Sequence, residues 1–290
     1  MDSKNGYDVI ACRQCLFKHI IPIPSDEELA QIYRKEYYSK EKPHYFKRMR
    51  EDIEWWNLVY NDKFDIFEKQ LSKKKRRILD IGSGPGYFLL CGKKRGWTTL
   101  GIEPSKQAAS YSRNLGVEVA EGFFDEKISK TLGAFNVVHM SEVVEHFPNP
   151  TKMIQISHSL LSLGGMLCVD APNDYNPFQH TLRTVDRHNP WWVAPPYHIN
   201  YFDFTSMKNL LERNNFKVFL QEATFPIDIF LLMGYNYVEN DSLGRACHSK
   251  RKRFELLLAK AGHNKLRRKL YNMFAGIGIG RNFIIFAKKK

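Results

Sequence analysis

The stretch from Arg77 to Gly86, which reads RILDIGSGPG, constrains the fold of this chain more than any other. Its first residues form an apolar run short enough for a buried parallel strand. Glycines then stand at alternate positions, where a ligand that lies against the backbone leaves no room for Cβ atoms. Pro85 suits the first turn of a helix, which we expect over residues 87–95. The stretch therefore predicts a strand, a ligand-binding loop and a helix.

The spacing of the glycines discriminates between ligands. A dinucleotide fingerprint that starts at Gly82 needs a glycine where Tyr87 stands, and a P-loop needs a Lys followed by Ser or Thr. Neither phosphate-binding motif is present. Asp80 would repel a pyrophosphate but attract a cationic amine, and Glu103, at the end of the next predicted strand, can bind a ribose diol. An adenosine that carries an amino acid would satisfy both carboxylates.

The pattern Asp-x-Gly-x-Gly-x-Gly over Asp80 to Gly86 resembles the first motif of the class I S-adenosylmethionine-dependent methyltransferases. The resemblance covers about residues 75–222 and points to the sugar and ubiquinone-type O-methyltransferases. It implies S-adenosylmethionine as cofactor, with adenine near Ile102, Phe123 and Phe124. The implied cofactor-binding residues are Asp80, Gly82, Ser83, Gly84, Gly86, Glu103, Pro104, Phe123 and Ser141. The alternative is a glycine turn without a nucleotide in an α/β domain.

From Lys75 onward, predicted strands and helices alternate, which indicates an α/β fold with a parallel sheet covered on both faces. The resemblance implies a Rossmann-like, seven-stranded, mostly parallel sheet with an antiparallel last strand. The expected strands are 77–81, 98–102, 117–120, 135–140, 166–170, 217–221 and 282–287. The expected helices between them include 105–115, 151–163 and 205–214.

The residues before this alternation divide into two segments. Residues 1–24 contain Cys12 and Cys15, a Cys-x-x-Cys pair that is half of a zinc ribbon. Because a structural zinc site needs four ligands, we expect this partial zinc-ribbon-like segment to hold no complete site in one chain. Residues 25–74 are expected to form a helical cap over the cofactor, with helices over 27–37 and 45–71 and a capping box at Ser25 and Glu28.

Two insertions lie outside the strand pattern, at residues 173–200 and 225–279. The methyltransferase domain is therefore expected over 75–224 and 280–290, with 225–279 as a helical insertion that caps the acceptor. Ligands of open α/β sheets bind beyond the carboxyl ends of the strands, where the loop after the fifth strand lies. Both insertions are accordingly expected to build the acceptor pocket.

Catalytic candidates follow the predicted fourth strand. Glu142, Glu145 and His146 stand at i, i+3 and i+4, so one helical turn would place them on one face. The Glu-x-x-Glu-His pattern resembles ubiquinone-type and small-RNA 2′-O-methyltransferases, in which these positions bind a divalent cation that lowers the pKa of the acceptor hydroxyl. His198, in a His-x-x-Tyr-Phe segment similar to sugar and quinone methyltransferases, is a fourth ligand, a general base or a packing histidine.

We favour a metal-free base, with His146 and His198 as the first candidates and Glu145 beside them. Glu142, Glu145, His146 and His198 are the candidate ligands if a divalent cation takes part. His139, His158 and His180 are weaker candidates, the first two because they fall inside a predicted strand and a predicted helix.

Charge and composition limit the partners. The formal net charge is +13, and basic clusters at 73–77, 250–253, 267–269 and 288–290 could meet nucleic acid, anionic lipid or a phosphorylated substrate, or form solvated surface. No aromatic-interleaved RNA motif accompanies them, which argues against nucleic acid. The chain has no signal-like start and no membrane-length apolar run, and its five cysteines do not form a disulfide framework. We therefore expect a cytoplasmic protein.

These patterns and the resemblance together predict a methyltransferase that modifies a sugar hydroxyl in surface polysaccharide or nucleotide-sugar biosynthesis. The expected partner is a small-molecule or glycan acceptor, anionic or close to a membrane. A quinone or phenol O-methyltransferase, an RNA 2′-O-methyltransferase and a catalytically silent S-adenosylmethionine-binding protein are the alternatives.

Overall fold

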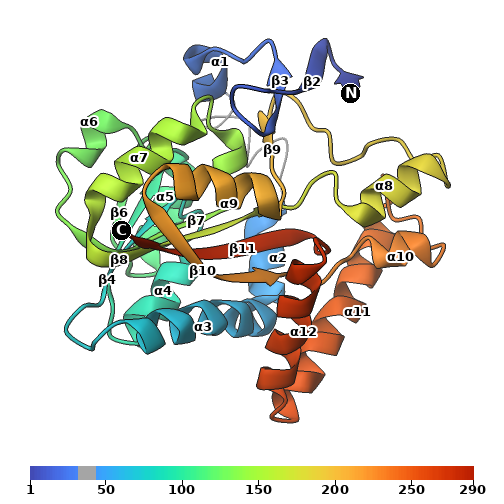
Figure 1. Cartoon of the computed structure of the whole chain (residues 1–290). Coiled ribbons are helices and arrows are strands. Elements are labelled where there is room, and N and C mark those ends of the chain that lie inside the picture. Colours follow the sequence, from blue (N-terminus) through green and yellow to red (C-terminus); the bar gives the residue numbers. More distant parts are fainter. Residues whose placement is uncertain (32–43) are drawn as a thin grey trace.

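A seven-stranded sheet organises the computed structural model, which describes residues 1–31 and 44–290 (Figure 1). The strand order is β10-β11-β8-β7-β4-β5-β6. Neighbours from β8 to β6 run parallel, whereas β11 is antiparallel to both β8 and β10. The predicted mostly parallel sheet with a reversed last strand is confirmed. The strands are β4 (Arg77–Ile81), β5 (Thr98–Glu103), β6 (Val119–Glu121), β7 (Phe135–Ser141), β8 (Leu161–Pro172), β10 (Phe216–Ala223) and β11 (Asn282–Lys289).

Helices cover both faces of this sheet because side chains alternate along each strand. In β4, Ile78 packs in a cluster with aromatic residues of α3 (Ile53–Gln70) and α4 (Tyr87–Lys94). Leu79 packs in a cluster with residues of α7 (Pro150–Leu160) and α9 (Phe204–Arg213). Both side chains have no exposed surface. The helices of this domain are α4 (Tyr87–Lys94), α5 (Lys106–Asn114), α6 (Glu126–Ser129), α7 (Pro150–Leu160) and α9 (Phe204–Arg213).

The strand order reverses between β4 and β7. The chain leaves β4 toward β5 and β6 and then returns to β7 on the other side of β4. Side chains at the carboxyl ends of these two strands therefore flank the crevice in which open α/β sheets bind ligands. The register of the pair sets Asp80 beside His139, and that of β7 with β8 sets Ser141 beside Asp170.

A second, four-stranded antiparallel sheet contains the first residues of the chain. Its order is β1-β2-β3-β9, with β1 (Asp2–Lys4), β2 (Tyr7–Ala11), β3 (Lys18–Ile21) and β9 (Asn200–Tyr201). The fourth strand begins at the last residue of the insertion at 173–200, so the zinc-ribbon-like segment and this insertion form one unit. Trp192 and Val193 of the insertion pack with Val9 and Ile20 in the small core of this unit. The same insertion contains α8 (Pro177–Thr184).

The helical segment before the large sheet differs from its prediction. Ser25 and Glu28 form the expected capping box at the start of α1 (Asp26–Gln31), and the rest of the helix expected over 27–37 lies outside the described residues. The single helix expected over 45–71 is divided into α2 (Tyr45–Glu51) and α3 (Ile53–Gln70). The break is at Asp52, whose buried carboxylate contacts Arg245, His248 and Lys252. A tertiary ion pair thus sets the boundary.

The insertion at 225–279 forms α10 (Ile229–Leu232), α11 (Asp241–Lys260) and α12 (Asn264–Gly276). The last two pack together as a hairpin, and α11 also packs against α3 (Figure 1). Among the residues that the structure describes, no helix combines the length and the apolar character that a bilayer crossing requires.

Candidate active site

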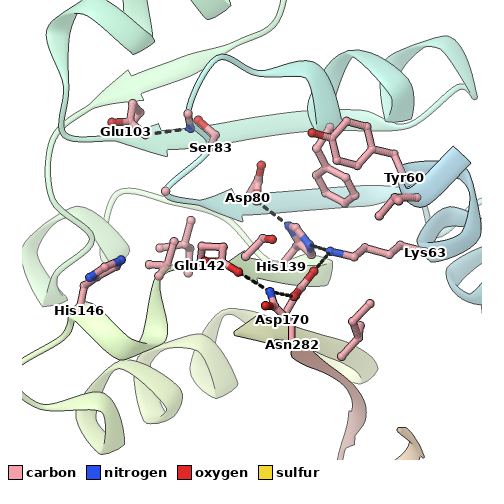
Figure 2. A pocket seen from close by; sticks show the side chains of 18 of the residues that line it. Tyr60, Lys63, Asp80, Ser83, Glu103, His139, Glu142, His146, Asp170 and Asn282 are labelled. Atoms are coloured by element: carbon pink, nitrogen blue, oxygen red, sulfur yellow. Dashed lines mark hydrogen bonds and ion pairs between the residues drawn. The ribbon is translucent and has the colours of Figure 1, made fainter. Parts of the chain in front are cut away.

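A cavity of about 890 Å³ opens at the carboxyl ends of β4, β5 and β7 (Figure 2). This volume lies within the range of small-molecule sites, and it exceeds what a single small metabolite fills. One end is formed by the glycine loop and the ends of β4 and β5, and we call it the cofactor end. The other end is formed by α3, α11, α12 and the adjoining ends of β10 and β11, and we call it the helical end.

The glycine loop lies at the cofactor end with the left-handed backbone that its sequence predicts. Gly82, Gly84 and Gly86 have φ values of 69°, 52° and 79°. Gly82 and Gly84 line the cavity, whereas Gly86 faces the next helix, where an added Cβ would lie 2.8 Å from Ser112 Oγ. Gly86, a predicted cofactor-binding residue, therefore stands behind the cavity and lets α4 and α5 pack closely.

Glu103 ends β5 with its carboxylate buried against the glycine loop. Its Oε2 accepts the backbone N–H of Gly84 at 2.8 Å, and its Oε1 accepts the N–H of Ser105 at 2.9 Å. Burial raises the pKa of Glu103 to about 7, although these two hydrogen bonds act in the opposite direction. Each carboxylate oxygen keeps a second lone pair, so a diol can still bind there. Pro104 and Phe123 line the cavity beside it, as do Ile102 and Phe124.

A buried polar chain crosses the floor of the cavity (Figure 2). Lys63 Nζ of α3 lies 2.7 Å from Asp170 Oδ2 and 3.1 Å from His139 Nε2. His139 Nδ1 lies 2.7 Å from Asp80 Oδ1. Because an ammonium group can only donate, His139 Nε2 accepts from Lys63, and its Nδ1–H donates to Asp80. The lysine thus sets the tautomer of the imidazole.

Burial and the contacts with Lys63 determine which of these hydrogen-bonded side chains are charged. Burial raises the pKa of Asp80 to about 8, although Lys63 opposes the shift. Burial also raises the pKa of Asp170, but the contact with Lys63 outweighs it and lowers the pKa overall. The pKa of His139 falls well below its usual value, through burial and the charge of Lys63. The lysine and Asp170 therefore form the ion pair, and His139 is neutral.

Sequence reasoning identified Asp80 and gave His139 as a weaker candidate, but it missed Lys63 and Asp170. Lys63 lies in the middle of a helix that reads as aromatic packing, and His139 lies inside a strand. The signal that could have revealed Lys63 is a lysine on the otherwise apolar face of an amphipathic helix.

The turn after β7 differs from the predicted helical turn. Val144–His146 is a short 3₁₀-helix, and Glu142 stands before it with a φ of 55°. The Glu142 carboxylate consequently points to β11, where it accepts a hydrogen bond from Asn282 Nδ2 (Figure 2). Ser141 lines the cavity at the end of β7. The expectation that Glu142 shares one face with Glu145 and His146 is therefore wrong, because the left-handed residue turns its side chain away.

Glu145, His146 and His198 do come together. Their ligating atoms lie within 4.8 Å of one another. Glu145 Oε1 lies 3.6 Å from His146 Nε2, and the two imidazole rings are 5.1 Å apart in an edge-on arrangement. The backbone N–H of Ile199 donates to the Glu145 carbonyl oxygen, which holds the His198 segment against the turn. His146 lines the cavity, whereas Glu145 and His198 stand behind it.

The two insertions contribute unequally to the cavity. The 225–279 insertion supplies Arg251, Glu255, Arg267, Arg268 and Tyr271 to its lining. The cavity lining contains no residue of 173–200, and the expectation that this insertion also builds the acceptor pocket is wrong. Its tryptophans pack under the small sheet instead. It acts on the site indirectly, through the residues around His198.

Cys12 and Cys15 lie on the small sheet, outside the cavity. The ligating atoms of both thiols and of His19 lie within 4.8 Å of one another. His19 Nδ1 lies 2.9 Å from the carbonyl oxygen of Ile20, which leaves Nε2 for the thiol side. The sequence pattern had identified only the two cysteines. Together with Cys91, Cys168 and Cys247 they are free thiols.

Comparison with known proteins identifies the family. A family model described as "Methyltransferase domain" matches residues 46–221. The chain belongs to this family. A ubiquinone biosynthesis O-methyltransferase of Caulobacter sp. (strain K31) is 26% identical over 167 residues, which cover 56% of this chain and 63% of that protein. A protein of the same name from Coxiella burnetii (strain Dugway 5J108-111) is 24% identical over 144 residues, which cover 44% and 62%. The match therefore spans less than two thirds of these relatives.

Solved structures show the same fold. A SAM-dependent methyltransferase from Archaeoglobus fulgidus superposes with a TM-score of 0.52 at 18% identity, covering 84% of this chain and 99% of that one. The plantazolicin methyltransferase BpumL, in complex with SAH, superposes with a TM-score of 0.51 at 14% identity, covering 90% and 94%. The sheet order and these likenesses establish the class I methyltransferase fold.

The cofactor end fits S-adenosylmethionine, the cofactor of this family. Gly82 and Gly84 present backbone without Cβ atoms to the cavity, so a ligand can lie against the loop. Asp80 offers a buried carboxyl with a raised pKa, which a bound ammonium or sulfonium cation would stabilise in its ionised form. Glu103 offers carboxylate oxygens for the ribose hydroxyls. The glycine backbone and the two acidic side chains thus match an adenosine that carries a positive charge.

Proposed function

We propose that this methyltransferase methylates a hydroxyl group of a small-molecule acceptor and that His146 is the base. The observation that carries the proposal is the position of His146, which faces the cavity while its Nδ1 lies 2.7 Å from the carbonyl oxygen of Tyr197. A carbonyl oxygen can only accept, so Nδ1 bears the proton and the lone pair of the neutral ring is on Nε2. The ring is thereby prepared to accept a proton at Nε2.

Glu145 supports the same role. Its Oε1 lies 3.6 Å from Nε2, and its side chain is 1% exposed. When Nε2 takes the acceptor proton, this carboxylate stabilises the imidazolium that forms. His198 packs edge-on against the ring and acts as a positioning residue.

S-adenosylmethionine, when bound, supplies an electrophilic methyl group on a sulfonium. As the acceptor oxygen takes this methyl group and the methyl–sulfur bond breaks, Nε2 of His146 would take the hydroxyl proton, and Glu145 would stabilise the imidazolium. Most of the acceleration of such a displacement comes from holding the two reacting atoms in line. The glycine loop and the wall formed by α3 supply this alignment in our proposal.

For the acceptor, we propose a sugar hydroxyl, as in nucleotide-sugar or surface polysaccharide synthesis. The volume of the whole cavity, about 890 Å³, and its aromatic wall of Trp55, Trp56 and Tyr60 support a ring-shaped acceptor. A phenol or quinone acceptor is the second candidate, and the similarity to ubiquinone biosynthesis O-methyltransferases favours it. The two classes differ in the pKa of the hydroxyl, so a sugar depends more strongly on the base.

Variants of His146 test the mechanism. His146→Ala is expected to lower kcat about 10²- to 10⁴-fold and to remove an imidazole-like ionisation from the pH profile. His180→Ala, at an exposed position of α8, is the matched control and should retain full activity. Incubation of the protein with S-adenosylmethionine and separate sets of nucleotide sugars and phenols, followed by mass spectrometry, identifies the acceptor class. Unchanged kcat in His146→Ala would refute the base, and unchanged kcat in His198→Ala would refute the positioning role of His198.

A metal-assisted version of the same reaction rests on one observation, the convergence of Glu145, His146 and His198. A cation there would lower the pKa of the acceptor hydroxyl. Treatment with EDTA separates the two versions. The metal-free version predicts full activity after chelation, whereas the metal version predicts loss of activity and recovery with Mg²⁺, Mn²⁺ or Zn²⁺.

A further inference from the structure

The helical end of the cavity is lined by arginine side chains, and three of them have one buried N–H group without an acceptor in the described part of the chain. Four arginines line it: Arg251 on α11, Arg267 and Arg268 on α12, and Arg281 before β11. The basic clusters at 250–253 and 267–269 therefore each contain a side chain that faces the cavity. An arginine that only completes a protein surface would keep its guanidinium in water.

Arg251 is the clearest case. Its guanidinium lies over the ring of Trp55, with 4.4 Å between Cζ and the ring centroid. Its Nε is buried without a hydrogen-bond partner in the described part of the chain. A buried donor of a charged group that lacks an acceptor is costly, and native structures rarely leave one unsatisfied.

Arg267 shows the same deficit on the neighbouring helix. Its side chain is 2% exposed, and its Nη2 donates to both carboxylate oxygens of Asp62 at 2.8 and 2.7 Å. Its Nε, however, is buried and has no acceptor within residues 1–31 and 44–290. Arg281 differs, because its buried Nη1 makes no hydrogen bond within the described residues but forms an ion pair with Asp174, with 3.5 Å between Nη1 and Oδ1.

The carboxylates nearby are already engaged. Glu255, one helical turn from Arg251, accepts from Tyr271 Oη at 2.6 Å and from Trp55 Nε1 at 2.5 Å. Glu222 accepts two hydrogen bonds from Arg268, at 2.9 and 2.6 Å. The protein thus uses neutral donors to satisfy Glu255, and Nε of the adjacent Arg251 has no acceptor in the described part of the chain.

We propose that the helical end binds an oxyanion of the acceptor, a phosphoryl or carboxylate group, through Arg251 with Arg267 and Arg281. This inference rests on the proposed function, because it makes the helical end the site for the part of the acceptor that does not react. Guanidinium groups bind phosphoryl and carboxylate oxygens through paired N–H donors, and the bond is stronger in a cavity than in water. A nucleotide sugar or a sugar phosphate carries such a group, and so does a hydroxybenzoate.

Binding of simple anions tests the proposal without knowledge of the acceptor. The protein is first saturated with S-adenosylhomocysteine and then titrated, by isothermal calorimetry, with pyrophosphate, inorganic phosphate or malonate. We expect at least one of these anions to bind with a single site per chain. Arg251→Gln should weaken that binding about ten- to a hundredfold, as expected for the loss of charge-assisted hydrogen bonds.

The matched control is Arg253→Gln, two residues along the same helix at an exposed position. It removes the same charge from α11 and should leave anion binding unchanged. Arg281→Gln provides a second variant at another element and should also weaken binding. Tighter binding of pyrophosphate identifies a phosphoryl source, and tighter binding of malonate identifies a carboxylate source.

Two results would overturn the inference. The first is no binding of any of the three anions to a protein that binds S-adenosylhomocysteine. The second is an equal loss in Arg251→Gln and Arg253→Gln, which would show a general effect of charge. Failure to bind S-adenosylhomocysteine would instead refute the proposed function, so the two failures can be told apart.

Discussion

The two ends of the cavity are built in different ways. The cofactor end takes its residues from consecutive strand ends and turns, between Asp80 and His146 in the chain. The helical end joins α3 to α11 and α12, although about two hundred residues separate them in the sequence. The cofactor end has the acids Asp80 and Glu103, whereas the helical end has four arginines together with the acids Asp62, Glu222 and Glu255. The comparison teaches that a local motif can specify the cofactor, whereas the acceptor depends on tertiary packing.

The largest expected effect lies in the glycine loop. Gly84→Val places a branched side chain at a residue with a φ of 52° that lines the cavity. The added atoms strain the backbone and occupy the space of the ligand, so binding of S-adenosylhomocysteine should fall below detection by calorimetry.

Gly84→Val also tests whether the two ends of the cavity bind their ligands independently. Anion binding at the helical end, measured in the absence of S-adenosylhomocysteine, should survive in Gly84→Val if the two ends are independent. A folded variant that binds S-adenosylhomocysteine with normal affinity would contradict the assignment of the cofactor end.

Lys63 connects the two ends, because it projects from α3 into the polar chain below the cofactor. Its side chain is 3% exposed and pairs with Asp170, which is 6% exposed. Lys63→Met leaves a buried carboxylate without its partner, at a cost of about 3–5 kcal/mol in the free energy of unfolding. Urea denaturation measures this loss.

The double variant Lys63→Met with Asp170→Asn is the control. It removes both charges and should recover a large part of the lost stability. Equal stability of Lys63→Met and the unmodified protein would show that the ion pair contributes nothing.

The sequence predicted the sheet and the cofactor end because both depend on short-range patterns. The alternation from Arg77 onward and the run Asp80 to Gly86 are visible without any tertiary information. The break at Asp52, the rotation of Glu142 toward Asn282 and the pairing of β3 with β9 depend on contacts between distant segments. The inward-facing arginines were present only as charge clusters, because a sequence does not show which member of a cluster is buried.

The two acids of the cofactor end also predict how the stability of the protein depends on pH. Burial raises the pKa of Asp80 to about 8 and that of Glu103 to about 7. A carboxyl group whose folded pKa is raised holds a proton that the unfolded chain has released, so stability without ligand should fall as pH rises from about 4 to 8. The free energy of unfolding should change by at most about 1.4 kcal/mol per pH unit for each proton.

A bound cation favours the ionised carboxylate and should therefore expel this proton. Calorimetric titration with S-adenosylmethionine at pH 6.5, in two buffers of different ionisation enthalpy, measures the number of protons released. Asp80→Asn should reduce that number. Equal apparent enthalpies in the two buffers would show that Asp80 and Glu103 are already ionised.

The smallest effect is expected outside both ends, at Cys12, Cys15 and His19. These residues provide three ligating atoms within 4.8 Å of one another, and a closed structural zinc site has four ligands. We therefore predict that the purified chain holds no stoichiometric zinc, although two chains could share an ion.

Cys12→Ser should change the free energy of unfolding by no more than about 0.5 kcal/mol, as for other substitutions that break no buried contact. Binding of S-adenosylhomocysteine and of pyrophosphate should be unaffected, because the small sheet contributes no side chain of this trio to the cavity. Elemental analysis that finds one zinc per chain, lost in Cys12→Ser, would show instead that His19 and a further ligand complete the site.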